Sequence, residues 1–206
     1  MKQSRLDALA DGIFAIVMTI LVFEIRVPEL SDMAGNREII LGIVHALPLF
    51  LAYLLSFAVL FTYWRAHHFI ASVYAKNIDL KLTNISAIFF FFVALVPFSS
   101  HLLGLYSDTQ TAIIFFSINT IAIGLSLYEM RLYIKRSETI ENEDVTPLED
   151  RHAYTRILFP VFCALVASVL SFWSTTSALT LLTFGVLFNL LPKATTHFYR
   201  FLGNKE

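Results

Sequence analysis

The chain has 206 residues, of which 57% are hydrophobic and 15% are charged, and its mean hydropathy is +0.68. This composition excludes an ordinary soluble domain and is typical of integral membrane proteins. The formal net charge of -1 offers no basic surface for nucleic acid, and the lone cysteine, Cys163, excludes an internal disulfide.

Six apolar runs follow one another along the chain and predict six membrane-spanning helices in a single domain, residues 1–206. A spanning helix needs roughly 20 residues, and the last two runs are near the lower limit. Prolines inside three of the runs predict kinks, because neighbouring helices satisfy the freed backbone groups in membrane proteins. The runs cover residues 8–27, 38–64, 79–103, 111–131, 157–174 and 176–195, and the prolines are Pro48, Pro97 and Pro160.

The links between the runs are short, and the last two helices are expected to form an antiparallel hairpin. The longest polar stretch, about 135–156, predicts an inner loop with a helical start to the fifth span. This stretch is too short to fold as a soluble domain. Any chemistry of the protein is therefore expected among the spans.

Lysine and arginine are distributed unevenly between the two ends of the spans. With the N-terminus inside, every Lys and Arg except Arg26 and Arg37 belongs to the cytoplasmic side. Cytoplasmic segments of membrane proteins carry this excess of positive charge. The pattern predicts an even number of spans with both termini in the cytoplasm. The first run lacks a cleavage site and is expected to remain as a helix.

The first run begins with charged residues and then carries a regular apolar stripe. At about 100° per residue, Ile16, Ile20 and Phe23 fall within about 60° of one another, and Thr19 lies at the edge of this stripe. Asp11 points about 140° away from Ile16, and a carboxylate at this depth needs a partner in the protein. From the pattern alone, plain contact with core or lipid is the favoured explanation of the stripe.

Three stretches carry a combination of motifs in the first half of the chain. RLDALADGIFAI, from Arg5, matches an R-x-x-x-F-S-D signature except that Leu9 and Ala10 replace Phe and Ser. YWRAHHFI, at 63–70, contains Trp-x-x-His-His, and NIDLKLTNISAIFFFFVALVPFSS, at 77–100, ends in Leu-x-Pro-Phe. In this order they resemble the transmembrane protein 175 family, the bacterial and lysosomal potassium channels. The C-terminal half resembles the family only in hydropathy.

The resemblance implies an all-α integral membrane protein with six transmembrane helices per subunit, in which the first helix lines the central pore of a homotetramer. In this family the residues five, nine and twelve positions after the signature Asp form the constriction. These are Ile16, Ile20 and Phe23, with Thr19 as the neighbouring polar residue, and the chain has no TVGYG carbonyl filter. The resemblance to bacterial members further implies the bacterial inner membrane, K+ as the permeant ion and no cofactor.

A ring of isoleucine side chains suggests how such a pore would select K+. A narrow apolar passage loses its water and acts as a gate. A slightly wider passage strips part of the water shell from an ion, and Na+ holds that shell more tightly than K+. By resemblance, a separate network fixes the inner end of the first helix, and its expected members are Arg5, Asp11, Trp64, His67, His68 and Asn84.

Two other functions are compatible with the sequence. A small intramembrane enzyme or secondary transporter would use Asp11 with His67 and His68, but spans four to six carry little polar chemistry to complete a cavity. A structural membrane subunit would conduct nothing and would turn its first helix toward lipid or a partner. Adjacent histidines do not share a helix face, so no metal site is predicted. A histidine is nevertheless suited to sensing pH near neutrality.

Overall fold

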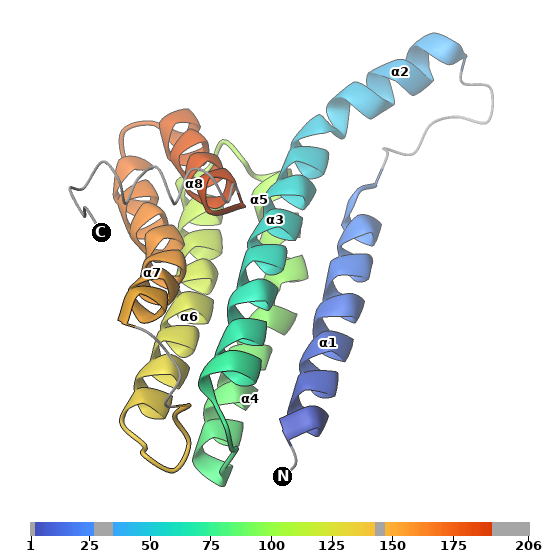
Figure 1. Ribbon diagram of the computed structural model, residues 1–206. Coiled ribbons are helices and arrows are strands. Elements are labelled where there is room, and N and C mark those ends of the chain that lie inside the picture. The colour runs from blue at the N-terminus through green and yellow to red at the C-terminus, as the bar shows by residue number, and fades with distance from the viewer. Residues whose placement is uncertain (1–2, 27–34, 143–146, 191–206) are drawn as a thin grey trace.

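The computed structural model describes residues 3–26, 35–142 and 147–190, with the backbone alone at 147–149, 151 and 152. These residues form a bundle of helices (Figure 1). In chain order the helices are α1 (Gln3–Ile20) continued by the 3-10 turn η1 (Leu21–Glu24), α2 (Asn36–His45), α3 (Leu47–Phe69) continued by the π-helical turn η2 (Ile70–Tyr74), α4 (Leu80–Ala94), α5 (Val96–Leu105), α6 (Gln110–Lys135), α7 (Pro147–Leu170) and α8 (Thr175–Leu190).

The long apolar helices confirm the predicted all-α membrane class. Five helical segments in the described part of the chain are long and apolar enough to cross a membrane, and α8 is a shorter apolar helix of 16 residues. α7 begins at Pro147, ahead of its apolar segment, which confirms the helical start expected within the polar stretch. The five long segments are Gln3–Glu24, Leu47–Tyr74, Leu80–Leu105, Gln110–Lys135 and Ala153–Leu170.

The second predicted span, 38–64, is wrong in its extent. The chain bends at Ala46, and α2 leaves the bundle at an angle while α3 begins at Leu47 (Figure 1). Pro48 is the physical reason, because its ring lacks an N–H and clashes with the carbonyl four residues earlier, at Val44. The spanning helix therefore runs from Leu47 to Tyr74.

The other helices depart less from the predicted ranges. The third run bends at Leu95, and α5 begins at Val96 with Pro97 as its second residue, whereas Pro160 lies inside the continuous helix α7. The first helix begins at Gln3 and not at residue 8, so Arg5 is within its first turns. The last part of the sixth predicted run, 191–195, is outside the described residues.

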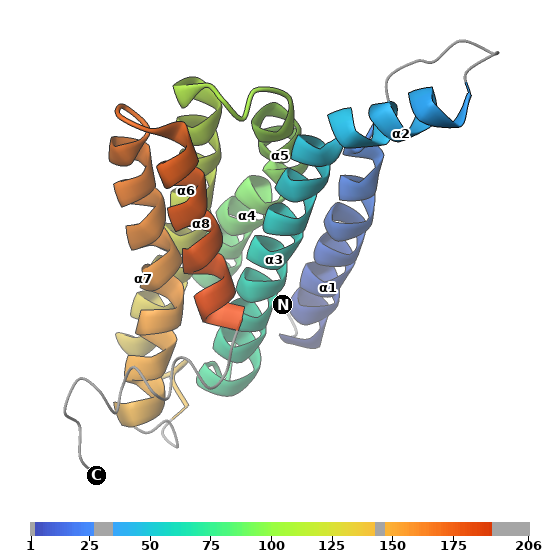
Figure 2. The same cartoon turned by 90° about the horizontal axis from the view of Figure 1, so that it is seen from above.

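α1 stands at one edge of the bundle, and α7 stands at the opposite edge (Figures 1 and 2). Between them, α6 packs against α4, α5 and α7, and α3 packs against α1, α5 and α8. At Gly124 and Gly185 an added Cβ would overlap with Val161 and Cys163 of α7. Small residues of this kind let membrane helices approach closely. α1 is less surrounded by other helices and has the lowest share of buried residues among the five long segments.

Candidate functional site: the open face of the first helix and its inner network

α1 has one buried face and one open face. Leu6, Ala10, Phe14, Val17 and Leu21 are buried at a spacing of three and four residues, which is one side of a helix. The ring of Phe14 packs against that of Phe89 in α4, with 5.9 Å between centroids. This buried face fixes the rotation of α1 against the rest of the subunit.

The predicted constriction residues lie on the open face. Ile16 is 59% exposed, Ile20 40% and Phe23 71%, and Thr19 is exposed beside them. The structure thus keeps the predicted stripe together, and the described residues of the chain leave it uncovered. Whether these side chains form the constriction remains a prediction.

The end of the helix changes the alignment of the stripe. Residues Leu21–Glu24 form a 3-10 turn, in which side chains three positions apart eclipse one another. Phe23 therefore follows Ile20 along nearly the same line. The hydroxyl of Thr19 donates to the carbonyls of Ala15 and Ile16 at 2.8 and 2.9 Å. Its proton is engaged within the helix, and only its oxygen lone pairs are available to an ion.

Three members of the predicted network are brought together between α1 and α3. The indole Nε1 of Trp64 donates to Oδ1 of Asp11 at 2.9 Å. The same indole stacks on the ring of His68, with centroids 6.2 Å apart and planes at 24°. Nδ1 of His68 lies 3.4 Å from the hydroxyl of Ser72. The carboxylate that the sequence analysis expected to find a partner on another helix is therefore held by Trp64.

The other three predicted members lie apart from this contact. His67 is buried and stacks on Phe89 at 5.1 Å with planes at 7°. Its Nε2 has no hydrogen-bond partner among the described residues. Arg5 and Asn84 are exposed. Among the described residues no hydrogen bond or ion pair joins Arg5, His67 or Asn84 to Asp11, and their place in the network stays a prediction.

Gln3 makes a link that the sequence analysis missed. Its Nε2 donates to the carbonyl of Ala71 and, at 3.1 Å, to the carbonyl of Ala75. These carbonyls belong to η2 and the residue that follows it, where the π-helical turn ends. Turns of this type are often found at functional sites, but neither the turn nor the bond has a pattern that single-sequence analysis detects.

A buried ionic cluster lies beyond η2. The guanidinium of Arg131 is almost fully buried; its Nε donates to Asp150 at 2.8 Å and its Nη2 donates to Glu141 at 3.2 Å. Its other face lies 4.4 Å from the ring centroid of Tyr74 in η2. Nζ of Lys135 donates to the second oxygen of Asp150 at 2.6 Å. The cluster ties α6 to α7, to the inner loop and to η2.

The charge of Asp150 is maintained by its partners. Burial acts to raise the pKa of this carboxyl, but hydrogen bonds from Lys135 and Arg131, together with their positive charges, outweigh burial and hold the pKa below its ordinary value. The sequence analysis counted Arg131 and Lys135 only as positive charge on the cytoplasmic side and did not single out Asp150. Their pairing depends on contacts between distant segments and leaves no local signal.

Comparisons with known proteins agree with the motifs. A sequence profile described as "Endosomal/lysosomal potassium channel TMEM175" matches residues 5–97. A protein named potassium channel from Chryseobacterium sp. (strain P1-3) is 31% identical over 139 residues, which are 67% of this chain and 68% of that protein. Another potassium channel, from Chamaesiphon minutus, is 33% identical over 105 residues, 51% of each chain.

The fold has a solved counterpart. The crystal structure described as a lysosomal potassium-selective channel TMEM175 homolog from Chamaesiphon minutus matches with a TM-score of 0.77 at 25% identity. The match covers 93% of this chain and 97% of the other. The resemblance first seen in three short motifs thus extends over nearly the whole bundle, and the chain belongs to the TMEM175 family of potassium channels.

Proposed function

We propose that this chain is a potassium-permeable cation channel that assembles as a homotetramer around the open faces of four α1 helices. The observation that carries the proposal is the division of α1 into a buried face and an exposed stripe of Ile16, Ile20 and Phe23. Related proteins named as potassium channels share the family. The channel function leaves no support for an intramembrane enzyme or transporter built on Asp11, His67 and His68.

The composition of the open face favours another protein copy over lipid as its cover. Beside the stripe it presents Gly12, Ala15 and the polar Thr19, all exposed, and an added Cβ on Gly12 would meet nothing within 4 Å. Helix interfaces in membranes are enriched in such small residues. In lipid the hydrophobic effect does not drive helix association, and close van der Waals packing replaces it.

In this arrangement the isoleucines form successive apolar rings along the pore axis. Alkyl groups offer no ligand to replace water, so an ion that passes must retain part of its shell or lose it without compensation. Na+ loses more hydration free energy than K+ in this step, so K+ passes more readily. Closure by a small rotation of α1 would expel water from the narrow passage and stop conduction.

Substitution of Ile16 tests this function. The purified protein in planar bilayers is expected to conduct K+ in preference to Na+, measured from reversal potentials under a salt gradient. Ile16→Asn should wet the passage and bring the K+ and Na+ permeabilities closer together. The matched control is Ile118→Asn in α6, because Ile118 is also 59% exposed. Equal effects of the two substitutions, or no cation current from the parent protein, would contradict the proposal.

We further propose that both termini face the bacterial cytoplasm, as the distribution of Lys and Arg supports. Exposed positions on opposite sides allow a test, since Cys163 is buried. In intact cells a membrane-impermeant maleimide should label Asp108→Cys, which lies between α5 and α6, and should leave Glu138→Cys, which lies after α6, unlabelled. The reverse labelling would refute this orientation.

A further inference from the structure

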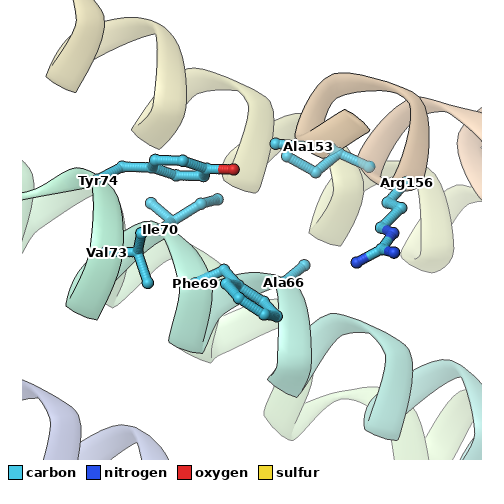
Figure 3. A pocket seen from close by; sticks show the side chains of 8 residues that line it. Ala66, Phe69, Ile70, Val73, Tyr74, Ala153 and Arg156 are labelled. Carbon is cyan, nitrogen blue, oxygen red and sulfur yellow. The ribbon is translucent and has the colours of Figure 1, made fainter. Parts of the chain in front are cut away.

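A groove separates the inner parts of α3 and α7. A cavity of about 150 Å³ lies between them and is lined mainly by apolar side chains (Figure 3). A smaller space of about 20 Å³ shares Ala66, Phe69 and Arg156 with it and adds Thr62, Arg65 and Asn189. We call the two together the α3–α7 groove. One part of it is apolar and the other part carries two guanidinium groups.

The two arginines of the groove have no anionic partner among the described residues. Arg65 and Arg156 are both half-buried, no described carboxylate lines either space, and neither side chain forms an ion pair within the described part of the chain. Figure 3 shows Arg156 reaching from α7 toward Ala66 and Phe69 of α3. Two like charges, partly removed from water and unpaired, favour an anion between them.

A hydroxyl in the same groove is also unpartnered. Thr62 is only 8% exposed, and its Oγ1 has no hydrogen-bond partner in the described structure. A buried threonine in a helix commonly donates to the carbonyl four residues earlier, as Thr120 does to Phe116. The free hydroxyl therefore adds a donor beside the guanidinium groups. Phosphate oxygens accept from both kinds of donor.

The apolar part of the groove distinguishes a lipid from a dissolved anion. Phe69 and Val73 are 44% and 39% exposed on a helix that crosses the membrane, so the groove opens toward acyl chains. Tyr74 lines the cavity and also stacks on Arg131. The groove therefore lies beside the ionic cluster around Arg131. Under the proposed orientation this is the cytoplasmic leaflet, where anionic lipids attract basic residues.

We propose that the α3–α7 groove binds an anionic phospholipid, with its phosphate between Arg65, Arg156 and the hydroxyl of Thr62 and an acyl chain against Phe69, Val73 and Ile157. The bound lipid would hold α7 against the inner end of α3. The inference goes beyond ion conduction, and it stands even if the pore face is assigned wrongly.

Native mass spectrometry with added lipid tests the site. The detergent-purified protein should retain phosphatidylglycerol more tightly than phosphatidylcholine. Loss of one arginine should weaken phosphatidylglycerol binding about fivefold, and loss of both about thirtyfold, from roughly 1 kcal/mol for each basic residue near an anionic surface. The variants are Arg65→Gln, Arg156→Gln and their combination. Thr62→Val should also weaken binding, by a smaller factor.

Arg136→Gln is the matched control, because Arg136 is an exposed inner arginine that lines neither space, and it should leave retention unchanged. An equal loss in this control would show general charge attraction and overturn the proposal. Equal retention of the two lipids by the unaltered protein would overturn it without any variant. Displacement of phosphatidylglycerol by millimolar glycerol phosphate would identify a site for a soluble anion and would also refute it.

Discussion

At the scale of single residues, the hydrogen bond between Trp64 and Asp11 holds α1 against α3. The indole donates to a carboxylate on α1 and also stacks on His68. Both interactions come from one side chain, so Trp64 joins the charge of Asp11 to the end of α3. This arrangement makes Asp11 a positioning residue for α1.

Replacement of Trp64 separates the hydrogen bond from the stacking. Trp64→Phe keeps an aromatic ring but removes the Nε1 donor, which we expect to cost about 1.5 kcal/mol as a bond to a charged group. The midpoint of thermal unfolding should fall and the channel's open probability should change. The chain contains one other tryptophan, Trp173, which is 78% exposed. Trp173→Phe serves as the control, and a shift of the same size there would argue against a role for the bond.

The ionic cluster of Arg131, Lys135, Glu141 and Asp150 makes the free energy of unfolding depend on pH through Asp150. Its folded-state pKa lies below the ordinary value, so the carboxylate stabilises the fold above an unfolded-state pKa of about 3.9. This stabilisation is lost as the pH falls through the lowered value. We expect Asp150→Asn to reduce the free energy of unfolding at neutral pH, because it leaves the buried guanidinium of Arg131 without this carboxylate. The same substitution should make the loss of stability at acid pH smaller.

Thermal unfolding in detergent, followed from neutral pH into acid, measures this effect. Asp108→Asn is the control, because Asp108 is exposed and has no hydrogen-bond or ion-pair partner among the described residues. An Asp150→Asn protein that loses as much stability in acid as the parent would exclude Asp150 as the source.

At the scale of elements, η2 connects α1 with the ionic cluster around Arg131. Gln3 of α1 bonds to carbonyls at Ala71 and Ala75, and Tyr74 in the same turn stacks on Arg131. The backbone of the inner loop joins them, since the N–H of Asn142 donates to the carbonyl of Tyr74 at 2.9 Å. Movement of α1 therefore requires these bonds to break or the turn to move with it.

Gln3→Ala removes the direct link between α1 and η2. The loss of about 1 kcal/mol should shift the equilibrium between open and closed channels about fivefold, because each 1.4 kcal/mol is a factor of ten. The K+ to Na+ permeability ratio should stay unchanged, since Gln3 is not on the stripe. Single-channel recordings measure both quantities. Ser4→Ala is the neighbouring control, and an altered permeability ratio in Gln3→Ala would contradict this assignment.

At the scale of the whole molecule, the open face of α1 is the surface at which we propose that four copies of the chain assemble. The chain buries one side of this helix and leaves the other side at the edge of the bundle (Figure 2). We expect the purified channel to have the mass of four 23.4 kDa subunits in native mass spectrometry. Ile20→Arg should disrupt this assembly through repulsion of like charges at the axis. A monomer of the unaltered protein in all mild detergents would refute the homotetramer.

The sequence by itself determined the class of fold, the approximate places of the long apolar helices and the grouping of the stripe. These properties depend on local composition and on the helical period, which act within about 20 residues. Two of the family motifs contain Asp11 and Trp64, which are distant in the sequence. The structure joins these two residues by a hydrogen bond. The prolines were recognised, but their effects differ: Pro160 stays within a helix, whereas the chain bends beside Pro48.

Only the tertiary structure decided which apolar side of α1 packs against the rest of the chain. Phe14, Val17 and Leu21 are as apolar as Ile16, Ile20 and Phe23, and in a membrane helix hydrophobicity does not distinguish packing from exposure. Shape complementarity with Phe89 and its neighbours makes that choice. The Gln3 link, the Arg131 cluster and the α3–α7 groove have the same origin, because each joins residues that are distant along the chain and that folding alone brings together.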